Sequence, residues 1–134
     1  SACRGSLSGI GRTTGREEIV RACVESIAYQ IRDVVDAMGA DAGICPESLR
    51  VDGGPTKNTY LMQFQSDMLG SEVLVSDSEE MSAIGAACAA GIVLGILPAD
   101  VTEQIKRTAY HPQMDEELRI KKWNGWKRAV VSIL

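Results

Sequence analysis

The 134-residue sequence has few aromatic side chains, which make up 4% of it, and no excess of positive charge, since its net charge is -4. Surfaces that bind nucleic acid are typically basic, and those that bind single strands also carry stacked aromatic rings. The sequence contains no apolar run close to the roughly 18 residues that cross a bilayer. We therefore expect neither nucleic acid nor a membrane among its partners.

Side chains that ligate metals or act as nucleophiles are also scarce. His111 is the single histidine, so a metal site or a Ser/His/Asp triad would lack most of its members. The four cysteines lack the paired short spacings of a zinc site and lie far apart, at Cys3, Cys23, Cys45 and Cys88. Cys23 and Cys88 fall in apolar helical stretches, where a free cysteine usually serves as a small core residue. We expect no metal site, four reduced thiols and a cytoplasmic location.

What the sequence does contain is typical of one globular domain. Hydrophobic residues are 45% of the chain and charged residues 24%, both ordinary proportions. A chain of this length buries roughly two-thirds of its unfolded surface, which is enough for a core. We predict a single domain over residues 1–134.

The beginning of the chain predicts a short strand and then a long helix. The strand is expected at residues 6–10. Thr14 and Glu17 have the spacing of a capping box, and apolar residues then recur every three or four positions up to Met38. Gly39 stands where a left-handed helix end is expected. The pattern predicts one amphipathic helix between Thr14 and Gly39.

The rest of the chain alternates strands and helices. The predicted order is a strand at 49–52, a helix over 60–68 closed by Gly70, a strand at 72–75, a helix from Ser82 to Val93, a polar helix from Pro98 to about Arg107, and a last helix from about Asp115 towards Leu134. The helix from Ser82 to Val93 is apolar or small on nearly every side, so we expect it to be buried against a sheet.

This alternation predicts an α/β layered fold with at least partly parallel strands. Three short strands make a thin sheet for such long helices. Either strands are supplied from outside this chain or one sheet edge stays open, and an open edge favours self-association. We expect the sequence to be a piece of a larger protein.

The most informative segment is the turn from Val51 to Asn58, between a strand and a helix. Gly53 and Gly54 have no Cβ, so the backbone can turn sharply and a ligand can approach it closely. The helix behind them offers backbone N–H groups and a positive dipole end, and Asn58 offers a donor and an acceptor. The turn therefore suits a nucleotide. The alternative is a plain tight turn, because a lone Gly-Gly is common at such places and neither GxxxxGK[ST] nor GxGxxG is present.

Other polar and aromatic groups have structural interpretations. An aspartate at a strand end, such as Asp52, more often bonds nearby backbone than acts as a base or metal ligand. The acidic run at residues 77–80 is expected to be a solvated loop, and so is the basic surface of the last helix. Trp123 and Trp126 lie three residues apart on one helix face, which favours packing over ligand stacking.

Two blocks of residues resemble the FGGY family of carbohydrate kinases. The first is Gly5-x-Leu7-x-Gly9-Ile10 followed by Glu18-Ile19-x-x-Ala22-x-Val24-Glu25, in which Cys23 departs from the family pattern. The second is the run 49–54, then Asn58, then 61–67 and Leu69-Gly70. The likeness continues weakly through 83–87 and 125–127 and so covers essentially the whole chain. Residues 26–30 and 32–34 are most similar to the family members that phosphorylate glycerol.

The resemblance implies the ribonuclease H-like fold of the C-terminal domain of actin/hexokinase/Hsp70-like ATPases. That domain carries a five-stranded mixed sheet whose first three strands are antiparallel. Residues 6–10 would form the third strand, and the first two would be absent from this chain.

The resemblance also implies a kinase that transfers the γ-phosphoryl group of ATP, with Mg²⁺, to the 3-hydroxyl of glycerol. Gly53, Gly54 and Asn58 match the family's adenosine-binding motif and are the predicted nucleotide-binding residues. Residues 55–57 depart from the family pattern, and Lys57 is expected to be solvent-exposed rather than to reach a phosphate. No residue matches the catalytic aspartate, which in the family lies upstream with the glycerol site, so we predict no catalytic and no metal residue here. The expected partners are ATP or ADP, glycerol in the full-length protein, an upstream kinase domain and further copies of the chain.

Three alternatives stay open at this point. One is a kinase of the same family that acts on another polyol or sugar. Another is a non-catalytic module with this fold, kept for regulation or assembly. The last is a plain α/β domain in which Gly53-Gly54 serves only the turn. On the leading interpretation, the chain by itself has no kinase activity.

Overall fold

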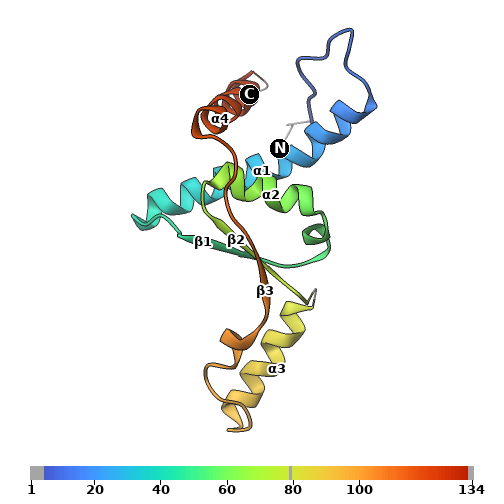
Figure 1. The fold of residues 1–134 in the computed structure, drawn as a ribbon. Coiled ribbons are helices and arrows are strands. Elements are labelled where there is room, and N and C mark those ends of the chain that lie inside the picture. Colours follow the sequence, from blue (N-terminus) through green and yellow to red (C-terminus); the bar gives the residue numbers. More distant parts are fainter. Residues whose placement is uncertain (1–4, 79, 133–134) are drawn as a thin grey trace.

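A computed structural model describes residues 5–78 and 80–132 of the chain. The helices and strands, shown in Figure 1, are α1 (Arg16–Ala42), β1 (Ser48–Val51), α2 (Thr59–Leu69), β2 (Glu72–Ser76), α3 (Met81–Val93), β3 (Arg107–Tyr110) and α4 (Glu116–Val131), with the short 3-10 helices η1 (Gly54–Lys57) and η2 (Val101–Gln104).

The described strands form one mixed sheet in the order β1-β2-β3. β1 and β2 are parallel, with Leu49 opposite Val73, and β3 runs antiparallel to β2, with Thr108 opposite Val75. The prediction of partly parallel strands is confirmed. The polar helix predicted up to Arg107 is wrong, because only Val101–Gln104 make a helical turn and the following residues pair with β2.

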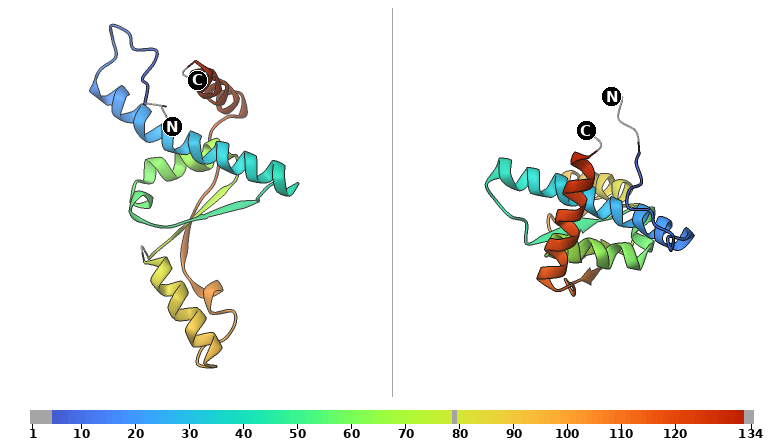
Figure 2. Two further views of the ribbon diagram at one scale, coloured as in Figure 1. Left: turned by 180° about the vertical axis from the view of Figure 1, so that it is seen from behind. Right: turned by 90° about the horizontal axis from the view of Figure 1, so that it is seen from above.

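The core lies where α2 packs between α1 and the sheet. Figure 2 shows α1 and α2 on the same side of the strands, and α2 contacts both α1 and β2. The buried side chains come mainly from these elements and are Ala28, Leu61, Met62, Phe64, Met68, Val73 and Val75. The hydrophobic face predicted for the helix over residues 60–68 is therefore confirmed.

The limits of α1 differ from those predicted. The Glu18 carboxylate accepts the N–H of Gly15 at 2.8 Å, whereas Thr14 accepts from Gly11, so the capping box predicted for Thr14 and Glu17 is wrong. The helix also continues past Gly39 and ends at Gly43, whose φ is 68°. Gly39 serves the helix end differently, because a Cβ there would lie 2.9 Å from the backbone oxygen of Ile44.

The predicted strand at residues 6–10 is absent. These residues have neither helical nor strand structure, and Leu7 and Ile10 are exposed. A strand needs a neighbour to pair its backbone N–H and C=O groups, and within the described part of the chain none lies beside this segment. Local apolar character alone was therefore not enough to form it.

α3 and η2 project beyond the end of the sheet, away from α1 and α2 (Figure 1). The predicted burial of α3 is wrong: its buried residues are Cys88 and Gly91, while Val93 is 86% exposed. A Cβ on Gly91 would lie 2.5 Å from Leu97 Cδ1, so this glycine allows the segment after α3 to fold back on it. The sequence correctly indicates an apolar helix, but the described chain covers only a narrow strip of it.

The cysteines also differ in burial. Cys88 is buried, as predicted, but Cys23 is exposed, because α1 buries only Glu25 and Ala28 and Cys23 lies on another side of the helix. Cys45 is exposed as well, and these three thiols are free. Cys3 lies outside the described residues. Within the described ranges, no helix is long and apolar enough to cross a bilayer.

Candidate functional site

The turn after β1 has a fixed backbone path. Gly53 has φ 95° and ψ 172°, a conformation that favours glycine. Its carbonyl oxygen accepts two hydrogen bonds from Thr56, one from the backbone N–H at 3.1 Å and one from the hydroxyl at 2.7 Å. The Asn58 N–H then donates to the Pro55 oxygen at 3.1 Å. The segment from Gly53 to Asn58 is thus a well-bonded turn between β1 and α2.

Gly54, unlike Gly53, does not have a backbone conformation that favours glycine. Its φ is not positive, and a Cβ built on it would meet nothing within 4 Å. The fold of the described residues therefore does not require glycine at this position. The space next to Gly54 is open, which leaves room for a ligand to approach the backbone.

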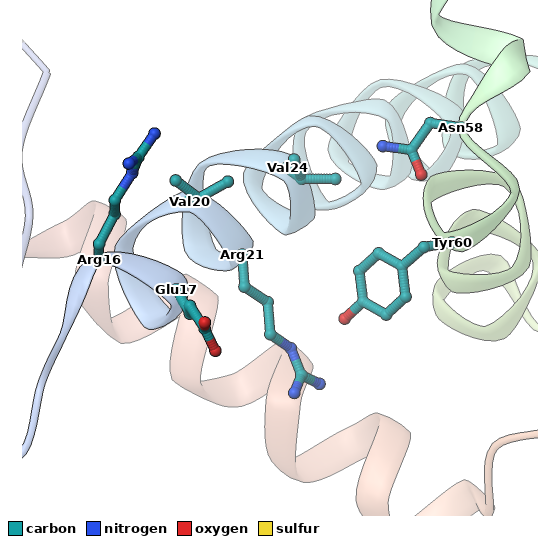
Figure 3. A pocket seen from close by; sticks show the side chains of 7 residues that line it. All are labelled: Arg16, Glu17, Val20, Arg21, Val24, Asn58 and Tyr60. Carbon is teal, nitrogen blue, oxygen red and sulfur yellow. The ribbon is translucent and has the colours of Figure 1, made fainter.

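Asn58 is the N-cap of α2. Its Oδ1 accepts the N–H of Leu61 at 3.1 Å, which satisfies a backbone donor at the helix start. In Figure 3 its amide nitrogen is directed towards α1. One side chain can thus cap the helix and still offer an N–H to a ligand.

A cavity of about 640 Å³ lies between the first half of α1 and the start of α2. Its lining residues, drawn in Figure 3, are Arg16, Glu17, Val20, Arg21, Val24, Asn58 and Tyr60. Val20, Val24 and the Tyr60 ring give it an apolar wall, while Asn58 and Arg21 give it polar groups. This combination and size are typical of small-molecule sites.

The predicted site residues contribute unequally to this cavity. Asn58 lines it, and Gly53 and Gly54 lie in the turn that leads to Asn58 without being part of the lining. The sequence analysis missed the wall from α1. The signal that could have found it is the spacing of Val20 and Val24, which places both on one face of a helix.

Glu25, on α1, links the cavity wall to α4. Its Oε1 accepts the Tyr60 hydroxyl at 2.5 Å and the Arg21 Nε at 2.7 Å, and its Oε2 lies 3.3 Å from the Lys122 Nζ of α4. Burial of this carboxyl raises its pKa, but the hydrogen bonds from Tyr60 and Arg21 and the charge of Lys122 outweigh burial, so the pKa of Glu25 is lowered. Burial and the bond to Glu25 raise the pKa of Tyr60.

The polar residues of the run 61–67 build the scaffold rather than the cavity. The Asp67 carboxylate accepts the N–H groups of Gln113 and Met114 at 2.7 and 3.1 Å. The Ser66 hydroxyl lies 2.9 Å from the carbonyl oxygens of Ser71 and Tyr110. α2 therefore holds the loop before α4 and the end of β3 through buried polar groups.

The other residues singled out in the sequence either pack against neighbouring rings or lie exposed. Tyr29 stacks on Trp126 with ring centroids 5.3 Å apart, so the predicted packing of the tryptophans is confirmed, and burial raises the pKa of Tyr29 to about 12. Lys57, Asp52 and Asp77 are exposed. Among residues 5–78 and 80–132, no three or more His, Cys, Asp or Glu side chains gather where they could hold a metal.

Comparison with known proteins places the chain in a family. The model of the FGGY family of carbohydrate kinases, C-terminal domain, matches residues 1–94. The glycerol kinases of Staphylococcus epidermidis and Aliivibrio fischeri are 44% and 47% identical to the chain over 133 and 130 residues, which cover 97% and 95% of it. The crystal structure of Plasmodium falciparum glycerol kinase with ADP has a TM-score of 0.90 and 37% identity over 100% of this chain.

The same comparisons define the extent of the match. The chain spans 27% and 26% of the two bacterial relatives and 28% of the Plasmodium falciparum chain. The fold is that of the actin/hexokinase-like ATPases, as predicted, in a small mixed α/β arrangement. With its family match over most of its length, the chain belongs to the FGGY family of carbohydrate kinases and corresponds to its C-terminal domain.

Proposed function

We propose that this chain is the nucleotide-binding C-terminal portion of a glycerol kinase, which converts ATP and glycerol to sn-glycerol 3-phosphate and ADP. The observation that carries the proposal is the cavity beside Asn58, in a chain whose whole length superposes on a glycerol kinase structure with ADP. The identities of 44% and 47% to two glycerol kinases support glycerol over other polyols and sugars.

The turn and the cavity wall would together hold the adenosine part of the nucleotide. The open space at Gly54 lets the ligand approach the backbone, and the Asn58 amide offers a hydrogen bond. Val20, Val24 and the Tyr60 ring offer an apolar wall against which the base is shielded from water. The chain's part in phosphoryl transfer is thus positioning of ATP, since such catalysis depends mostly on positioning and charge neutralisation.

The other parts of the reaction are assigned to the rest of the protein. Among the described residues no three or more His, Cys, Asp or Glu side chains gather to hold a metal, and we assign the Mg²⁺ that accompanies ATP to the rest of the protein. No residue is assigned as catalytic base. We therefore expect no turnover from this chain alone with glycerol and Mg-ATP. Residues 1–134 would act as one domain of a cytoplasmic enzyme, together with an upstream kinase domain and in a homo-oligomer.

Calorimetric titration of Mg-ADP into the chain tests the proposed site. We expect saturable binding, and we expect Gly54→Val to weaken it on the order of tenfold, because the added side chain fills the space where the ligand approaches. Gly125→Ala is the matched control, since Gly125 also has a non-positive φ and open space but lies in α4. Binding that is absent, or equal in the Gly54→Val variant, would contradict the proposal.

A further inference from the structure

Glu25 is a buried carboxylate that the proposed reaction does not use, yet it touches both the cavity and α4. It is 7% exposed and joins Arg21 and Tyr60, which line the cavity, to Lys122. We propose that Glu25 is a positioning residue that couples α4 to the nucleotide cavity: Lys122 fixes the carboxylate, and the carboxylate fixes Tyr60 and Arg21. The part of this inference that concerns nucleotide affinity rests on the proposed function.

The two oxygens of Glu25 serve different neighbours. Oε1 accepts from Tyr60 and from Arg21, at 2.5 and 2.7 Å, while Oε2 faces the Lys122 Nζ at 3.3 Å. A carboxylate is a rigid group, so a rotation that moves one oxygen moves the other. If Lys122 is lost, Oε2 becomes a buried acceptor without its cation, and the carboxylate turns towards its remaining donors.

The groups on the cavity side lie partly in solvent and are bonded to the carboxylate, so they move with such a rotation. Tyr60 is 43% exposed, and the Arg21 guanidinium lies 5.6 Å from the centre of the Tyr60 ring. In Figure 3 the Arg21 side chain extends from α1, and the Tyr60 hydroxyl, from α2, is directed towards it. Their positions depend on the carboxylate between them, so a change at Lys122 reaches the wall of the cavity.

The chain offers a matched control for this connection. Lys127 also joins α4 to α1, with its Nζ 3.0 Å from Asp33 Oδ1, and also lies over an aromatic ring, 5.1 Å from the centre of Trp123. Lys122 lies similarly over Phe64, at 5.2 Å. The two lysines differ in exposure, at 25% of the side chain for Lys122 and 57% for Lys127, and in their partners, since Asp33 does not line the cavity and Glu25 holds two residues that do. Phe64 also stacks on the Tyr60 ring, with centroids 6.1 Å apart, so Lys122→Arg, which keeps the cation, is the closer control.

The experiment compares Lys122→Met with Lys127→Met in the full chain. We expect Lys122→Met to shift the nuclear magnetic resonance signals of the Tyr60 ring without nucleotide, and to weaken Mg-ADP binding on the order of fivefold. Lys127→Met is expected to change neither. Lys122→Arg keeps the cation and is expected to restore both. Tyr60→Phe is the reciprocal variant, which keeps the ring and is expected to move the Lys122 side-chain signals.

The possible results separate the inference from the proposed function. Three results would overturn the coupling. In the first, Lys122→Met does not move the Tyr60 signals; in the second, both methionine variants move them equally. In the third, Lys122→Met leaves the Mg-ADP affinity unchanged. If Lys122→Met unfolds the chain, Tyr60→Phe decides: Lys122 signals that move support the coupling, and unmoved ones overturn it. If the unchanged chain does not bind Mg-ADP but Lys122→Met still moves the Tyr60 ring, the proposed function fails and the structural coupling stands.

Discussion

The region of α1, α2 and α4 and the region of α3 and η2 come from one chain but are stabilised differently. In the first, buried apolar side chains and polar links such as Glu25–Lys122 join the helices. In the second, α3 is an apolar helix that lies mostly exposed and contacts mainly η2. The difference teaches that the cavity lies beside the buried core of the described residues, whereas α3 lies apart from that core.

The largest expected difference between the regions comes from truncating apolar side chains. Met68 is fully buried, so Met68→Ala should lower the free energy of unfolding by about 2–5 kcal/mol. Val93→Ala in α3 should change it by less than about 0.5 kcal/mol, because that side chain is exposed. Urea denaturation measures both. Equal effects would mean that α3 is as well packed as α2.

A smaller contrast is expected between two aspartates. Asp67→Ala removes the acceptor of the Gln113 and Met114 N–H groups and should cost about 1–3 kcal/mol. Asp77→Ala is the control near α3, since Asp77 is exposed and the bond that it accepts from Thr108 is long, at 3.5 Å. Its expected cost is under about 0.5 kcal/mol. Thermal unfolding followed by circular dichroism compares them. A larger loss of thermal stability for Asp77→Ala than for Asp67→Ala would contradict this prediction.

Acid should weaken the first region through Glu25. The pKa of this carboxyl is lowered in the folded chain, because hydrogen bonds from Tyr60 and Arg21 and the charge of Lys122 outweigh its burial. A lowered folded pKa contributes stability that is present above the ordinary value of 4.5 and is lost as the pH falls through the folded pKa. Glu25→Gln should therefore flatten the decline of the free energy of unfolding below that pH. A decline as steep as in the unchanged chain would show that other carboxyls cause it.

The smallest expected effect is a stabilisation of α3. Gly85 lies inside this helix, and a Cβ there meets nothing within 4 Å. Gly85→Ala should stabilise the chain by about 0.5–1 kcal/mol through the helix propensity alone. Gly91→Ala is the matched variant in the same helix, where the new Cβ would collide with Leu97 and remove the gain. Urea denaturation of the two variants checks this prediction. Equal free energies of unfolding would contradict the packing of Leu97 on α3.

The sequence predicted the elements whose signals are local. The apolar face of α2 and its left-handed glycine at Gly70 were predicted and both occur in the structure, whereas the capping role of Asn58 was not predicted. The strand predicted at residues 6–10 does not form, because a strand also needs a neighbouring strand to pair its backbone groups. β3 was missed because a polar edge strand such as Arg107–Tyr110 has no alternating apolar pattern and is defined by its pairing with β2.

The candidate site shows the same limit. The turn from Gly53 to Asn58 could be predicted from two glycines directly after a strand, together with their match to the family motif. The contact between Arg21 and Tyr60 could not, because these residues meet only when α2 packs on α1, and they are held there by Glu25. Contacts between residues so far apart in sequence depend on the packing angle of two helices, which no local pattern specifies.

The most direct test of the nucleotide site is to follow the backbone amide signals of the isotope-labelled chain during titration with Mg-ADP. The account predicts saturable shifts centred on Gly53, Gly54 and Asn58, extending to Val20, Val24 and Tyr60 across the cavity, with the amides of α3 unaffected. A well-dispersed spectrum in which these signals do not move, or in which the shifts centre on α3, would contradict it.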